Sequence, residues 1–233
     1  MFEIKSFGSG SAGNCYTVTD GTTKILLEAG IGIKDIKKAL DFKVSSLAGA
    51  LVSHSHGDHA KAVKDVAKLG VNVFMSDGTA KELGINHHRI MPVNPRQAFT
   101  IGTLRIMAFE VEHDTDAPFG FLIQNEAGEK LLFATDTYFI RYKFKGITHL
   151  MIECNFSEED LDRRIAEGRT NKVMKRRLMR SHFSLENVKI FLKANDLSKL
   201  DETWLLHLSD ANSDAIRFKK EIAELTGKPV YIP

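Results

Sequence analysis

The chain has 233 residues, of which 43% are hydrophobic and 27% charged, and its formal net charge is +2. This length allows one large domain, and we expect a single domain over residues 1–233. No apolar run is long enough to span a bilayer and the N-terminus lacks an apolar signal core, so we expect a cytoplasmic protein with no membrane partner. The only cysteines, Cys15 and Cys154, exclude a disulfide framework and a cysteine-based zinc site.

Short β-rich runs alternate with helical periods, which predicts an α/β fold. In chain order, the expected strands are Glu3–Phe7, Cys15–Thr19, Lys24–Glu28, Gly49–Ser53, Asn72–Met75, Leu104–Glu110, Gly120–Ile123, Lys130–Thr135, His149–Glu153, Thr203–Leu206 and Val230–Ile232. The expected helices are Lys34–Phe42, His59–Leu69, Thr79–Leu83, Ser157–Glu167, Ser184–Ala194 and Ser209–Thr226.

A histidine-rich motif follows the apolar strand Gly49–Ser53 and reads His54-Ser55-His56-Gly57-Asp58-His59. Because side chains alternate along a strand, His54 and His56 project to the same side, and Gly57 permits a tight turn into the next helix. Asp58 and His59 can then point at a second position nearby. Imidazole and carboxylate ligands together suit zinc, manganese or iron. Three histidines and an aspartate within six positions disfavour the alternative of exposed polar loop residues.

This HxHxDH pattern after a strand resembles the metallo-β-lactamase superfamily, which implies a four-layer αβ/βα sandwich with two divalent metal ions. The family's other ligands follow in order, as His113, Asp136 and His207, each at the end of an expected strand. By this resemblance one metal is held by His54, His56 and His113, the other by Asp58, His59 and His207, and Asp136 bridges them. Asp58 is also expected among the catalytic residues.

The opening loop indicates a branch of this superfamily. Gly8-Ser9-Gly10-Ser11-Ala12-Gly13-Asn14 resembles the loop of the YycJ/WalJ-type branch, which is associated with 5′-to-3′ exonuclease activity. Related loops occur in the cyclic phosphodiesterase of phosphonate breakdown, and ribonuclease Z is a further relative. We expect Ser11 and Asn14 to contact the substrate. From the residues alone, a tight hairpin without catalytic consequence is an equal alternative.

A later segment resembles the same branch. It runs from Lys175 to Ser184, and His207-Leu208-Ser209 follows further on. The resemblance implies that His182 faces the substrate phosphate, as a contact or as the general acid. Ser184 also fits an N-cap, which is a structural explanation for part of the pattern. The chain departs from the branch at Glu28, where Asp is usual, at Glu153-Cys154-Asn155 and at Ser181.

Positive charge is concentrated in the basic segment, residues 160–183. Arg163 to Arg180 carries eight basic residues against one acidic residue. A polyanion bound there would release counterions, and we expect Lys175, Arg176 and Arg177 to bind substrate. A solvated helix face is the alternative, and the nearness of His182 favours the substrate role.

The sequence therefore favours a dinuclear metal-dependent phosphodiesterase with zinc or manganese, whose metals share a hydroxide that attacks phosphorus. The expected substrate is nucleic acid, with DNA favoured over RNA. Two alternatives stay open. One is a hydrolase of small molecules such as a cyclic nucleotide, lactone or thioester, and the other is a non-catalytic module that binds nucleic acid.

Overall fold

The computed structural model describes residues 1–233, which form two compact units. The first unit comprises Met1–Glu110 and Thr115–Lys130, and the second comprises Val111–Asp114 and Leu131–Pro233. None of its helices combines the length and the apolar character that crossing a membrane requires. The single domain expected from the sequence stays a prediction.

The first unit contains a six-stranded sheet whose strands follow chain order. They are β1 (Glu3–Gly8), β2 (Cys15–Thr19), β3 (Lys24–Leu27), β4 (Gly49–Leu51), β5 (Val73–Met75) and β6 (Ile90–Pro92). The pairs β1–β2 and β2–β3 are antiparallel, whereas the pairs from β3 to β6 are parallel. The continuous apolar runs of β3 and β4 suit parallel strands covered on both faces.

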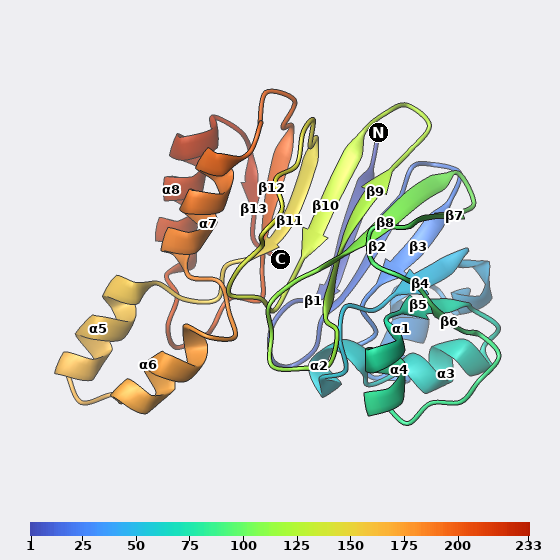
Figure 1. Ribbon diagram of the computed structural model, residues 1–233, viewed down its shortest axis with the longest axis horizontal. Coiled ribbons are helices and arrows are strands. Elements are labelled where there is room, and N and C mark those ends of the chain that lie inside the picture. Colours follow the sequence, from blue (N-terminus) through green and yellow to red (C-terminus); the bar gives the residue numbers. More distant parts are fainter. The chain divides into compact units, whose positions relative to one another are not determined.

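Short helices cover this sheet (Figure 1). They are α1 (Ile33–Ala39), a 3₁₀ turn (Val44–Ser46), α2 (Gly57–Ala60), α3 (Val63–Lys68) and α4 (Asp77–Glu82). Leu26, Val52 and Val66 belong to the buried core that the sheet shares with these helices. An antiparallel meander completes the unit, formed by β7 (Ala98–Ile101), β8 (Leu104–Glu110) and β9 (Phe119–Gln124).

The second unit is built on four parallel strands. These are β10 (Lys130–Ala134), β11 (His149–Glu153), β12 (Glu202–Leu206) and β13 (Val230–Tyr231). Ala134 lies opposite Ile152, and Glu153 lies opposite Leu206, so the strands end at one edge of the sheet. The helices α7 (Leu185–Ala194) and α8 (Ala215–Thr226) lie beside this sheet (Figure 1). Parallel strands that end together bring the residues that follow them close to one another.

The basic segment forms a helical hairpin of α5 (Glu158–Ala166) and α6 (Lys172–Leu178), which projects from the rest of the second unit (Figure 1). Ser157 and Asn171 cap the two helices by accepting backbone N–H groups. No residue of α6 is buried. The basic side chains of α6 are therefore accessible.

Every predicted strand is present within two residues of its predicted bounds, but β6 and β7 were not predicted. The helix predicted over His59–Leu69 is wrong as one element. It is split into α2 and α3, because the N–H of Ala62 donates to the carbonyl of Ala29 at 2.8 Å instead of continuing the helix. The last helix begins at Ala215, not at Ser209, since Asp214 caps it.

Candidate metal centre

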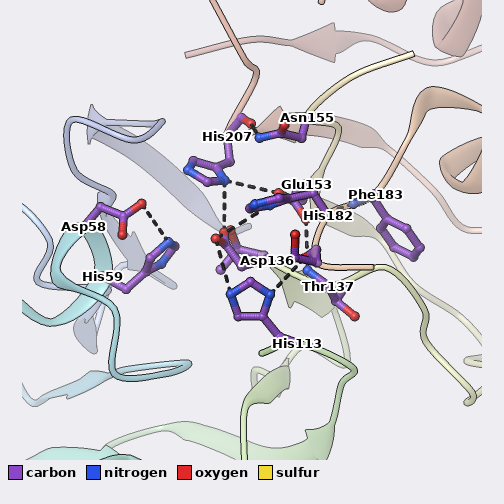
Figure 2. A network of polar contacts seen from close by, with 12 residues as sticks. Asp58, His59, His113, Asp136, Thr137, Glu153, Asn155, His182, Phe183 and His207 are labelled. Atoms are coloured by element: carbon purple, nitrogen blue, oxygen red, sulfur yellow. Dashed lines mark hydrogen bonds and ion pairs between the residues drawn. The ribbon is translucent and has the colours of Figure 1, made fainter. Parts of the chain in front are cut away.

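The first unit gathers the four residues of the histidine-rich motif in and before α2. The ring of His54 lies 4.9 Å from that of His56 and 4.2 Å from that of His59, between centroids. Oδ2 of Asp58 lies 3.4 Å from Nε2 of His59, a contact drawn in Figure 2. His54 and His59 are buried. Three imidazoles and a carboxylate therefore lie close together in this unit.

Glu28 supports this cluster from the end of β3. Its Oε1 accepts the N–H of Ser53 at 3.1 Å, and its Oε2 lies 3.5 Å from Nδ1 of His59. Burial raises the pKa of Glu28, although contacts with His59 and Ser53 oppose the rise. A proton on Nδ1 facing this carboxylate puts the lone pair of His59 on Nε2, as in carboxylate–histidine–metal triads.

The opening loop, residues 8–14, contacts the turn that carries Asp58 and His59. Asn14 is buried, and its Nδ2 lies 3.3 Å from the carbonyl of Asp58 and 3.1 Å from Nε2 of His59. Its Oδ1 accepts from the N–H of Gly10 and the hydroxyl of Tyr16, each at 3.0 Å. Asn14 thus holds the turn, a role that the sequence did not indicate. Ser11 is exposed in the loop, and a substrate contact by Ser11 or Asn14 stays a prediction.

Two glycines beside the turn differ in their roles. A Cβ on Gly30 would lie 1.6 Å from the carbonyl oxygen of Asp58, so only glycine allows this approach. Gly57, expected to permit a tight turn, has open space around it and no positive φ. The helix α2 does begin at Gly57, but the turn into it does not require glycine at this position.

The second unit gathers polar residues at the ends of three adjacent strands. Asp136 follows β10, Glu153 ends β11 and His207 follows β12. Nδ1 of His207 lies 3.0 Å from Oδ1 of Asp136 and 3.1 Å from Oε1 of Glu153 (Figure 2). Together with His182, these residues place their ligand atoms within 4.8 Å of one another.

Backbone strain marks two of these positions. Asp136 has φ 37° and His207 has φ 53°, values in the left-handed region that non-glycine residues seldom adopt. Each such residue costs about 1–3 kcal/mol and persists only where the surrounding structure holds it in place. This backbone conformation directs both side chains toward the same cluster. Strained residues of this kind are typical of functional sites.

Glu153 contacts several residues of the cluster in the second unit. Its Oε1 lies 2.6 Å from Nδ1 of His182, and its Oε2 accepts the N–H groups of Thr137 at 2.9 Å and Phe183 at 3.1 Å (Figure 2). Burial by itself would lower the pKa of His182, but the nearby carboxylates of Glu153 and Asp136 outweigh it and raise that pKa. The opposing charge of His182 keeps the pKa of Glu153 low despite complete burial.

His113 joins this cluster through the short segment Val111–Asp114. Its Nδ1 donates to the carbonyl of Ser181 at 2.8 Å, which puts the lone pair on Nε2. Nε2 lies 3.1 Å from Oδ1 of Asp114 and 3.9 Å from Oδ2 of Asp136. Burial lowers the pKa of His113 more than the carboxylates raise it. A neutral imidazole with a fixed tautomer is the form that binds a metal ion.

The donor set in each unit fits divalent metal ions. Imidazole nitrogens and carboxylate oxygens are present together; a hydrogen bond on Nδ1 orients His113, and the carboxylate of Glu28 lies 3.5 Å from Nδ1 of His59. The residues that sequence reasoning missed are Glu153 and Asn155, whose Nδ2 donates to the carbonyl of His207 at 2.8 Å. Glu153 ends an apolar strand just as Asp136 does, and that shared position was the available signal.

The basic segment is partly neutralised. Lys175 lies 2.5 Å from Asp162, Arg169 lies 3.3 Å from Glu167, and Arg163 pairs with Asp160. By contrast, Arg176, Arg177 and Arg180 are exposed and contact no carboxylate. Among the residues predicted to contact the substrate, Arg176 and Arg177 therefore carry positive charges with no acidic partner, whereas Lys175 forms an ion pair with Asp162.

Residues 23–194 match the family model described as the beta-lactamase superfamily domain. The chain is 26% identical to the exodeoxyribonuclease YycJ of Bacillus anthracis over 236 residues, which cover 94% of this chain and 84% of that protein. It is also 26% identical to the exodeoxyribonuclease WalJ of Streptococcus pneumoniae, in a match that covers 97% of this chain and 86% of that protein.

Solved structures agree in fold. The metallo-β-lactamase fold protein YhfI from Bacillus subtilis matches with a TM-score of 0.77 at 15% identity, over 100% of this chain and 95% of that one. A diphosphatase of the PhnP family matches with a TM-score of 0.67 at 14% identity. Human tRNase Z, short form, matches with a TM-score of 0.65 at 13% identity. These two cover 100% of this chain and 95% and 96% of theirs. The predicted α/β sandwich is confirmed, and the chain is a metallo-β-lactamase-fold hydrolase that belongs to the beta-lactamase superfamily.

Proposed function

We propose that this protein is a dinuclear metal-dependent phosphodiesterase that acts as a 5′-to-3′ exonuclease on DNA. The observation that carries the proposal is the paired set of clusters. The first unit gathers His54, His56, Asp58 and His59, and the second unit gathers His113, Asp136, Glu153, His182 and His207. A non-catalytic module would have no need for two such sets.

The proposed metal centre has the ligand set that the resemblance to the superfamily implies. His54, His56 and His113 would hold one ion, Asp58, His59 and His207 would hold the other, and Asp136 would be a ligand to both. Zinc or manganese suits this set of nitrogen and oxygen donors. Two bound ions would activate water as the nucleophile and offset the negative charge of the phosphate. Asp58 contributes to catalysis as the carboxylate ligand that follows the two motif histidines.

His182 is the proposed general acid. It is 18% exposed, so a substrate can reach it, and Nδ1 contacts Glu153 at 2.6 Å. The carboxylate favours the protonated imidazolium, and Nε2 then carries the proton that the departing sugar oxygen requires. Glu153 is a positioning residue in this scheme, because it acts through His182.

DNA as the substrate is supported by the names of the two relatives at 26% identity, both exodeoxyribonucleases. The exposed charges of Arg176 and Arg177 on α6 are suited to the phosphate backbone of a polyanion. The diphosphatase and tRNase Z structures share the fold only. A small-molecule hydrolase would leave these exposed arginines without a role.

The proposal is tested by digesting 5′- and 3′-labelled oligonucleotides, single- and double-stranded, as DNA and as RNA. The protein is first reconstituted with Zn²⁺ or Mn²⁺, and a chelated sample serves as the control. We expect stepwise release from the 5′ end of DNA, abolished by chelation. Hydrolysis of bis-p-nitrophenyl phosphate without cleavage of any oligonucleotide would contradict the nuclease assignment and favour a small-molecule hydrolase.

A further inference from the structure

An apolar pocket of about 410 Å³ lies in the second unit, between the segment after β10 and helix α7. Aromatic and aliphatic side chains form most of its lining, among them Tyr138, Phe139, Tyr142, Phe183, Ile190 and Phe191. Phe139 and Ile190 remain 54% and 65% exposed, although both are large and hydrophobic. Exposed apolar surface gathered at a concave place is typical of a binding site.

The walls of this pocket are fixed by the candidate metal centre. Thr137, at the start of one wall, and Phe183, in the other, both donate backbone N–H groups to Oε2 of Glu153 (Figure 2). The second oxygen of that carboxylate contacts His182. Asn187 of α7 donates to the carbonyl of Tyr138 at 3.4 Å and ties the walls together again. The lining residues Tyr138 and Phe183 follow closely on Asp136 and His182 in the chain, so the pocket adjoins the segments that carry these two residues.

The lining indicates a flat aromatic ligand with a negative charge attached. Tyr138, Phe139 and Tyr142 offer ring surfaces, and the cations Arg141 and Lys143 belong to the same lining. Arg141 also pairs with Glu112, whereas Lys143 is exposed and makes no ion pair. Single-stranded nucleic acid is bound by this combination, with bases stacked on aromatic rings and phosphates near cations.

We propose that this pocket receives one unstacked nucleobase of the substrate strand, next to the scissile phosphate. The proposal rests on the nuclease function proposed above and adds a subsite to it. A base subsite explains why apolar residues are exposed here, close to a polar catalytic cluster. Binding in such a subsite would not depend on the identity of the base, because every base has a ring face.

The test is a scan of abasic sites through a single-stranded oligonucleotide, with Phe139→Ala and Ile190→Ala as variants. For the wild type, one abasic position should raise KM about tenfold, while the other positions have little effect. In Phe139→Ala, the intact oligonucleotide should show the raised KM and that abasic position should add no further penalty. The ratio of oligonucleotide to bis-p-nitrophenyl phosphate hydrolysis should fall about tenfold in both variants.

Phe42→Ala is the matched control, because Phe42 is an aromatic residue of the first unit that is 76% exposed. It should match the wild type in every measurement. A flat abasic scan in an active wild type, or Phe139→Ala and Ile190→Ala behaving like Phe42→Ala, would overturn the base subsite alone; a pocket for a protein partner would give that result. Failure of the wild type to cleave any oligonucleotide would overturn the proposed function, and the subsite with it.

Discussion

Oε1 of Glu153 lies 2.6 Å from Nδ1 of His182, and the same carboxylate contacts His207 at 3.1 Å. One buried acid thus orients both the proposed general acid and a proposed metal ligand. Its second oxygen is occupied by two backbone N–H groups, so the carboxylate has little freedom to rotate. The ring of His182 is consequently fixed before substrate arrives.

Replacing Glu153 by Gln should shift the pH dependence of hydrolysis. The carboxylate raises the pKa of His182, so its loss lowers that pKa. A general acid must be protonated, and activity falls as pH rises through its pKa. The alkaline limb of kcat/KM should therefore move to lower pH in Glu153→Gln. Glu126→Gln, at an exposed turn, is the control. An unchanged alkaline limb in Glu153→Gln would contradict this role.

Gly30→Ala should disrupt the histidine-rich turn. The added methyl would lie 1.6 Å from the carbonyl oxygen of Asp58, so the backbone must move. We expect the free energy of unfolding to fall by about 3 kcal/mol, with weaker metal binding. The matched control is Gly57→Ala in the same turn, where a methyl meets nothing. Denaturant melts and metal titrations measure both effects, and equal behaviour of the two variants would refute the explanation.

Reversing two charges on α6 should weaken nucleic-acid cleavage selectively. In Arg176→Glu/Arg177→Glu, the oligonucleotide kcat/KM should fall more than tenfold relative to that for bis-p-nitrophenyl phosphate, and its dependence on salt should become shallower. Lys219→Glu/Lys220→Glu, on α8 of the same unit, makes the same change of charge on another exposed helix face. If both double variants lose activity equally, net charge and not the α6 surface is responsible.

The two cysteines should be unreactive in the native protein. Both are buried free thiols, and burial raises the pKa of Cys15 to about 12 and the pKa of Cys154 well above its usual value. At pH 8 the thiolate fraction of Cys15 is on the order of 10⁻⁴, and only the thiolate reacts. A disulfide reagent should label neither cysteine until denaturant is added. Rapid native labelling would show that this packing is wrong.

The positions of the candidate metal ligands could be predicted because local sequence places these residues directly after strands. His54 and His56 follow one strand with the spacing that its alternation requires, and Asp136 and His207 each follow an apolar strand. Glu153 occupies the equivalent end of β11, where the sequence showed only a departure from the branch and no role for this residue. Its role depends on pairing between strands that lie far apart in sequence, which composition does not reveal.

Other features depend on contacts that no local pattern contains. The break between α2 and α3 arises from a hydrogen bond between Ala62 and Ala29. The strand β6 is three residues long and ends in Pro92, so it has little alternation to detect. Counting charges overestimated the positive charge of the basic segment, because Arg163 and Lys175 pair with Asp160 and Asp162, which both precede the counted stretch from Arg163 to Arg180.

The most direct test of the central claim is the number of metal ions bound per chain, measured by mass spectrometry of metals alongside phosphodiesterase activity. Wild type should bind two equivalents of Zn²⁺ or Mn²⁺. His54→Ala in the first unit and Asp136→Asn in the second should each reduce the metal content and abolish turnover. Retention of two equivalents and of activity in both variants would contradict a dinuclear centre built from these ligands.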